Sequence, residues 1–153
     1  MSYDNMLAEA LCLLGEFSGG PLPAFDDEGL CVLAHDDGFG VTLLRTQGSD
    51  ILLLSAQLIE VPQDGREALF AWLLRLNFLG LDTGGAALSL DEEERHVYLC
   101  HGAPLSRLDA PGLVTLIGNF IDAAASVRQR LLGEAPAVAA DAALVPGVGW
   151  IHG

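Results

Sequence analysis

The spacing of apolar residues along the chain predicts a helix near each end. Over residues 3–14 apolar side chains recur every three or four positions, with Ser2 as a candidate cap and Gly15 as a candidate stop. A longer helix is expected between a cap at Asp109 and a stop at Gly133. Its apolar stripe keeps helical spacing throughout: Leu113, Leu116, Ile117, Phe120, Ile121, Ala124, Val127 and Leu131.

A further helix, expected in the middle of the chain, is apolar nearly all round. Asp64 is placed to start it, and Glu67 occupies the capping-box position ahead of the run 68–78. A surface helix of a monomer normally keeps a polar half. Either this helix is central to the core, or one face packs on its own sheet and the other on a second subunit. In a domain of this size we expect the second arrangement.

Five strands complete the pattern. Turn residues separate apolar or alternating runs at 30–35, 41–45, 51–61, 86–90 and 96–101. The order α-β-β-β-α-β-β-α predicts an α+β fold, with a twisted antiparallel sheet flanked by helices. We expect a single domain over 1–133 and a flexible C-terminal tail over 134–153, since the tail is rich in Ala, Val, Gly and Pro without periodicity.

The chain is strongly acidic. Its 153 residues include 7 basic and 21 acidic side chains, which gives a net charge of −14, and no lysine is present. Such a chain repels nucleic-acid phosphates and anionic membrane surfaces. The charge either keeps a hydrophobic protein soluble or attracts a sticky or basic partner, and composition alone leaves both interpretations open.

The cysteines and the N-terminus indicate where the protein works. Cys12, Cys31 and Cys100 lie in apolar segments and form no CxxC pair, which is typical of buried thiols in a reducing compartment. No basic and apolar leader is visible, and no apolar run reaches the roughly 18 residues of a membrane helix. We therefore expect a cytoplasmic protein without membrane insertion.

Few residues point to chemistry. There is no phosphate-binding loop, no GxSxG elbow and no lysine for a Schiff base. His96 and Cys100 share one face of a strand while His101 points the other way, so at most two metal ligands converge. Turn chemistry accounts for the residues 35–37, which read His-Asp-Asp. We expect no enzyme, no cofactor and no metal; the apolar surplus that remains indicates an interaction protein.

Several segments carry a family pattern across residues 3–132. They are LAEALCLLG (7–15), the acidic turn DDEG (26–29) before LCVL (30–33), LIEVP (58–62), LLRLN (73–77) ahead of a glycine-containing loop, LSLD (88–91) and LIGNFI (116–121). In their order and acidity these segments resemble the class I chaperones of bacterial type III secretion, the group that includes the Tir chaperone.

The resemblance implies a bacterial cytoplasmic homodimer without a catalytic site, which binds the N-terminal region of one or a few secreted effectors. The bound segment would stay extended, add a strand to a sheet edge and place side chains on apolar patches. The complex would keep the effector soluble and competent for secretion. Two alternatives are a regulator of the same fold, which sequesters a transcriptional or secretion-control protein, and an unrelated small α+β enzyme or ligand-binding domain.

Site residues follow from the same resemblance. Effector contacts are expected from Leu7, Leu11, Leu14, Val32 and Leu43. The dimer interface is expected on the middle helix, also because that helix is apolar all round, at Phe70, Trp72, Leu73 and Leu76. Ordinary core packing accounts at least as well for each effector-contact residue singly, and about half of the four helix residues must belong to the core, since one face of the helix packs there. We expect the effector segment to be neutral or basic, since complementary charge speeds encounter.

Overall fold

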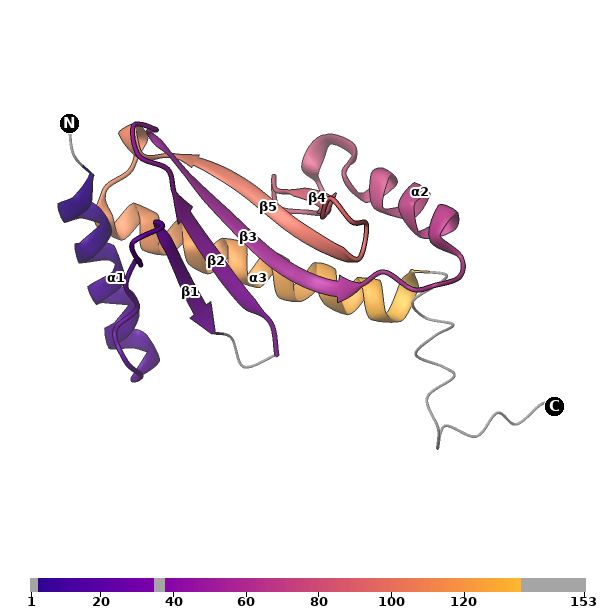
Figure 1. Ribbon diagram of the computed structural model, residues 1–153, viewed down its shortest axis with the longest axis horizontal. Helices are drawn as coiled ribbons and strands as arrows, with labels where there is room; N and C mark the ends of the chain where they lie inside the picture. The colour runs from indigo at the N-terminus through magenta and orange to yellow at the C-terminus, as the bar shows by residue number, and fades with distance from the viewer. Residues whose placement is uncertain (1–2, 35–37, 136–153) are drawn as a thin grey trace.

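The computed structural model describes residues 3–34 and 38–135, which form one antiparallel sheet with helices packed on it. The strands lie in the order β1-β2-β3-β5-β4, with bounds β1 Leu30–Ala34, β2 Gly40–Arg45, β3 Ile51–Glu60, β4 Ala87–Leu90 and β5 His96–Pro104. The helices are α1 Asp4–Ser18, α2 Arg66–Leu76 and α3 Ala110–Glu134, with short 3-10 turns η1 Phe78–Gly80 and η2 Leu105–Arg107. The expected α+β fold is confirmed, and Figure 1 shows α3 crossing behind the sheet.

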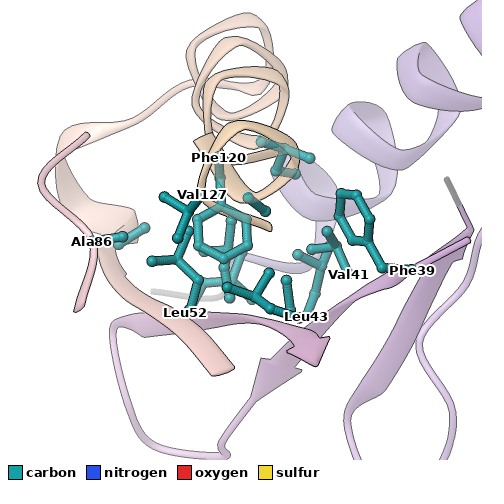
Figure 2. Close-up of a cluster of buried hydrophobic side chains, with 14 of the residues drawn as sticks. Phe39, Val41, Leu43, Leu52, Ala86, Phe120 and Val127 are labelled. Carbon is teal, nitrogen blue, oxygen red and sulfur yellow. The ribbon is translucent and has the colours of Figure 1, made fainter. Parts of the chain in front are cut away.

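One face of the sheet forms the core against α3. Along β3 every second side chain is buried, namely Leu52, Leu54, Ala56 and Leu58. The helix supplies the facing stripe, which is buried at Leu113, Ile117, Phe120, Ala124, Val127 and Leu131. In Figure 2 the side chains of Leu43 and Leu52 rise from the sheet toward Phe120 and Val127 of α3.

The long helix α3 begins and ends nearly where the sequence predicts. The carboxylate of Asp109 accepts a hydrogen bond from the Gly112 N–H at 2.8 Å, so the expected cap is confirmed. Gly133 does not stop the helix, which continues to Glu134, and the next residue, Ala135, is fully buried. The helix and the buried Ala135 thus extend past Gly133, while the domain boundary expected there stays a prediction.

By length and composition α3 also passes a test for membrane helices, contrary to the expectation that no such run exists. It has 25 residues and a mean hydropathy of 1.3 over its most apolar window, and it is the one helix of the described ranges that qualifies. Core helices of soluble proteins pass the same test, and the apolar stripe of α3 packs on the sheet. The apolar character of α3 is therefore explained by its packing in the core.

The first helix is longer than the sequence predicts. It runs past Gly15 to Ser18 and ends at Gly19, which adopts the left-handed conformation (φ 64°) that glycine tolerates best. Gly15 lies inside the helix, where the side chain of Leu22 occupies the space that a Cβ would fill, so the close packing of Leu22 requires a glycine there. The helix begins after Tyr3 without a side-chain cap, and Ser2 lies outside the described residues.

The middle helix starts differently from the prediction. Its N-cap is Gly65, in the left-handed conformation, and no side chain caps the first turn. The capping box expected from Asp64 and Glu67 is therefore wrong. The apolar run expected over 68–78 breaks at Asn77, because the chain turns there into η1.

The strands agree with the sequence to within a residue, except that β5 is three residues longer and ends at Pro104. It is longer because its last residues pair with the beginning of β3, where Ile51 lies opposite Pro104. The turn residues 35–37 and the tail from 136 to 153 lie outside the described residues.

The three cysteines are free thiols in different environments. Cys31 is buried and Cys100 is half-buried, and burial raises the pKa of both thiols. Cys12 is exposed on α1, so the expectation that all three cysteines are buried is wrong at this position.

Candidate functional site

The outer edge of β1 carries backbone groups that point away from the sheet. The Arg45 N–H donates to the Gly29 carbonyl at 2.8 Å, which makes these two residues a hydrogen-bonded pair. Such pairs alternate with non-bonded pairs along an antiparallel ladder. The register places Leu30 opposite Leu44. The N–H and C=O groups of Leu30, Val32 and Ala34 therefore point outward.

At Leu30 this edge is closed by a single residue. The Leu30 N–H donates to the Asp26 carboxylate at 2.8 Å, and the Asp26 N–H donates to the Leu30 carbonyl, also at 2.8 Å. The turn that returns Asp26 to the strand requires Gly29, whose φ is 81° and whose ideal Cβ would lie 2.2 Å from the Arg45 carbonyl oxygen. Asp26 thus replaces a neighbouring strand at one position and ends the free edge there.

Beyond Leu30 the edge is open. Within the described residues the outward backbone groups of Val32 and Ala34 have no hydrogen-bond partner. Both residues are exposed, and Val32 shows 66% of its surface. An exposed edge strand is a template for pairing with another chain. Two outward residues provide two donors and two acceptors for an added strand.

The opposite edge of the sheet, at β4, is closed by side chains at Ala86 and Leu88. The Asn77 amide accepts from the Leu88 N–H at 2.7 Å and donates to the Leu88 carbonyl at 3.0 Å. Thr83 covers the position before the strand, because its carbonyl accepts from the Ala86 N–H and its hydroxyl donates to the Ala86 carbonyl. Thr83 is fully buried. A further strand at Ala86 or Leu88 would have to displace these bonds.

A mostly apolar groove runs along α1. It has a volume of about 400 Å³, and one wall is formed by Leu7, Ala8, Leu11 and Cys12. The segment 22–25 forms the other wall, and Arg45 closes one end in an ion pair with Asp4. A neighbouring hollow of about 570 Å³ shares Asp4, Phe25 and Arg45 and is lined by the acidic turn 26–29. The groove therefore offers apolar walls beside negative charge.

A second apolar surface lies on the outward side of α2 and η1. We call it the α2–η1 patch; its members, each 70–79% exposed, are Leu74, Phe78, Leu79 and Leu81. Leu79 holds a left-handed backbone (φ 57°), which is unfavourable for a leucine. Four large apolar side chains so close in sequence and so exposed are typical of an interaction surface.

The expected effector-binding residues differ in how far they are exposed to solvent. Val32 lies on the open edge, as described, and Leu14 is half-buried on α1. Leu7 and Leu11 line the groove, but less than a tenth of the surface of each residue is exposed to solvent. Leu43 is 1% exposed in the core, so contact between an effector and this side chain would require the core to open, and its role stays a prediction.

Of the four expected dimer-interface residues, two are partly exposed and two are buried. Phe70 and Trp72 are half-buried, whereas Leu73 and Leu76 face the core at 5% exposure each. The outward face of the same helix carries the α2–η1 patch instead, which sequence reasoning missed. No sequence signal marked it, because Phe78, Leu79 and Leu81 lie beyond the end of α2 at Leu76, where the chain turns away from the helix.

The ionisable groups form structural contacts. His96 and Asp91 bond through Nδ1 and a carboxylate oxygen at 2.8 Å, and this hydrogen bond lowers the pKa of the Asp91 carboxyl. Asp91 also accepts from the N–H groups of Arg95 and His96, which closes the hairpin tip. In the parts of the chain that the structure describes, no three His, Cys, Asp or Glu side chains gather as a metal site would require.

Three solved complexes contain a chain with a similar fold. The chain superposes on the ExsC–ExsE complex with a TM-score of 0.69 at 24% identity, covering 84% of this chain and 96% of that one. The HopA1–SchA chaperone–effector complex gives 0.61 at 23%, covering 83% and 93%. The heterodimeric ExoU–SpcU complex from the type III secretion system of Pseudomonas aeruginosa gives 0.61 at 20%, covering 83% and 95%.

The sequence comparison agrees with the fold. No curated protein matches the chain. Residues 10–128, which span α1 to most of α3, match the Tir chaperone protein (CesT) family, and they include both sheet edges and most of the groove. The chain therefore belongs to the Tir chaperone protein (CesT) family, a family of type III secretion chaperones and not of enzymes.

Proposed function

We propose that this chaperone binds the N-terminal region of a secreted effector in extended form, as a strand added to the outer edge of β1. The observation that supports this most directly is the pair of open positions at Val32 and Ala34. Backbone hydrogen bonds would supply affinity there, and pockets for alternate side chains would supply selectivity. The Asp26 bonds limit the added strand at Leu30, so the paired stretch is short.

The groove along α1 and the charge of the chain favour a particular kind of segment. Apolar side chains of the effector would enter the groove between α1 and residues 22–25. The acidic turn 26–29 and the net charge of −14 favour a neutral or basic segment, since opposite charge speeds encounter. Binding of this kind requires no cofactor and no nucleotide, and it suits a protein of the bacterial cytoplasm.

A homodimer completes the proposal. The α2–η1 patch would pack against its copy on a second subunit, because a two-fold interface uses the same surface on both partners. Phe70 and Trp72 keep enough exposed surface to contribute at its border. Leu73 and Leu76 would support the interface from within the core.

The test is capture of the effector from cells under secretion-inducing conditions, with mass spectrometry of the proteins that elute. Val32→Pro removes the outward N–H, and proline is tolerated on edge strands. Val32→Thr is the matched control, since it keeps the N–H and the β-branched shape. We expect the proline variant to lose a secreted protein that the wild type and the threonine variant retain.

Equal capture by both variants, with unchanged circular dichroism, would refute strand addition at β1. Capture of a cytoplasmic regulator in place of a secreted protein would refute the effector and favour the regulatory alternative.

A further inference from the structure

The helix α2 carries three charged side chains, and two of them have no partner in their own chain. The Arg66 guanidinium forms an ion pair with the Glu94 carboxylate at 3.1 Å. Glu67, in the first turn, and Arg75, in the last turn, are exposed, and among the described residues neither forms a hydrogen bond or an ion pair. They are eight positions apart, or about 12 Å along the helix, whereas side chains of one helix pair at spacings of three or four.

Both charges lie on the outward face of α2. The inward face is marked by its buried residues, which are Leu69, Leu73 and Leu76. With 3.6 residues per turn, Glu67, Ala71 and Arg75 fall on the opposite side of the helix, and all three are exposed. Ala71 is midway between the two charges, four residues from each. The outward face therefore has a negative end, a small residue at its centre and a positive end beside the α2–η1 patch.

A two-fold axis at Ala71 would make this face complementary to itself. In an antiparallel pair of α2 helices related by such an axis, each residue lies opposite the one that is equally far on the other side of Ala71. Glu67 then faces the partner's Arg75, and Arg75 faces the partner's Glu67. The exposed Leu74 faces the partner's Ala68, so that a large apolar side chain meets a small one.

Other arrangements of the two helices bring like charges together. A parallel pair would place Glu67 against the partner's Glu67 and Arg75 against the partner's Arg75. An antiparallel pair centred on the α2–η1 patch, between Leu74 and Phe78, would place the two Arg75 side chains next to each other. Like charges in contact are unfavourable. The charges thus favour one register among those that an apolar surface alone would accept.

We propose that Glu67 and Arg75 form two reciprocal ion pairs across the homodimer, in which the two α2 helices lie antiparallel with the two-fold axis at Ala71. This inference deepens the proposed function, because it rests on the outward surface of α2 and η1 as the dimer interface. The partner that fits is a second copy of this chain, since only a helix with both charges at this spacing forms both pairs.

The arrangement leaves the proposed effector site accessible. The strand β4, to which Asn77 joins the end of α2, lies at one edge of the sheet, and β1 lies at the other edge (Figure 1). A dimer formed through the outward face of α2 therefore keeps the β1 edge of each subunit outside the interface.

Charge reversal tests the inference, with sedimentation velocity on the full chain to measure the dissociation constant of the dimer. Glu67→Arg alone or Arg75→Glu alone sets like charges against each other, so we expect the dissociation constant to rise about tenfold for each variant. In an equal mixture of the two variants, every pair is again opposite in sign, and the wild-type value should return. Arg107→Glu, at an exposed position on η2, changes the net charge as Arg75→Glu does and should dimerise like the wild type.

The reversal at Glu67 separates these ion pairs from the overall charge of the chain. A negative side chain becomes a positive one, so the net charge of each subunit changes from −14 to −12. General repulsion between two acidic chains would then fall and the dimer would tighten. The ion pairs require the opposite result.

A Glu67→Arg variant that dimerises as tightly as the wild type, or a mixture that does not recover, would overturn the inference. A wild type that is monomeric at micromolar concentration would overturn it as well. Recovery in the mixture shows in addition that both variants fold. The experiment contains no effector, so its failure leaves the capture experiment unaffected, and a failed capture leaves the measured dimer in place.

Discussion

The side-chain amide of Asn77 binds both backbone groups of Leu88, as the residue of a neighbouring strand would. One side chain thereby joins the end of α2 to the outer edge of β4 across eleven positions of sequence. Together with Asp26 at Leu30 and Thr83 at Ala86, it determines where the sheet accepts a further strand.

Replacement of Asn77 by alanine should destabilise the fold. Two hydrogen bonds are lost and the Leu88 groups face solvent or an intruding strand, so we expect a loss of about 2 kcal/mol in the free energy of unfolding. Urea denaturation measures it. Asn119→Ala, at an exposed position on α3, is the control and should change stability by less than about 0.5 kcal/mol. Equal losses for the two variants would contradict the role given to Asn77.

Gly29 and Gly48 separate backbone strain from steric conflict. Both have positive φ, at 81° and 78°, but a Cβ on Gly29 would meet the Arg45 carbonyl oxygen whereas one on Gly48 would meet nothing within 4 Å. Gly48→Ala should therefore cost about 1 kcal/mol, from the left-handed conformation alone. Gly29→Ala should cost about 3 kcal/mol, since the turn that carries Asp26 must also shift. Urea denaturation of both variants compares them, and similar costs would show that the turn yields easily.

The α2–η1 patch should hold two subunits together. Introducing Leu74→Glu and Phe78→Glu in one chain places two charges on this surface, so a dimer should dissociate to monomers. Light scattering at micromolar concentration gives the mass. Phe17→Glu, on an α1 side chain that is 82% exposed, is the control and should remain dimeric. A monomeric wild type would rule out the patch as a dimer interface.

Asp91 should make stability depend on pH in the acid range. Hydrogen bonds from His96 lower the pKa of the folded-state carboxyl below its unfolded value of about 3.9. The stabilisation is therefore present above about pH 4 and is lost as the pH falls through the lower, folded-state value. Thermal unfolding of wild type and Asp91→Asn between about pH 2 and pH 6 should show a shallower acid slope in the variant. Parallel curves would show that the His96 contact is not formed in solution.

Local signals in the sequence predicted the elements well, and the reason is visible at Asp109. That cap is a contact between residues three positions apart, so the sequence contains all of it. Gly15 shows the limit of such reasoning. The sequence predicts a helix stop at Gly15, but this glycine lies beside Leu22 of the following loop, and Gly19 is the residue that ends the helix.

The candidate site was harder to predict because it depends on which surfaces the fold covers. Alternation along β2 shows that Leu43 and Thr42 face opposite sides of the sheet, but only the packing of α3 decides that the leucine is the buried one. In the same way, the apolar run of α2 does not reveal that Leu73 points inward and Leu74 outward. The strand-replacing contacts of Asn77 and Asp26 become visible only when the strand order is known.

The closed edge at β4 also limits how these molecules can aggregate. An open fibre grows by sheet pairing only if each molecule has two complementary binding edges, one for the molecule before it and one for the molecule after it. Here the sheet has a receptive end at Val32 and a sealed end at Leu88. Pairing between sheets through these two positions would stop after two molecules, so the β1 edge alone does not support an open fibre.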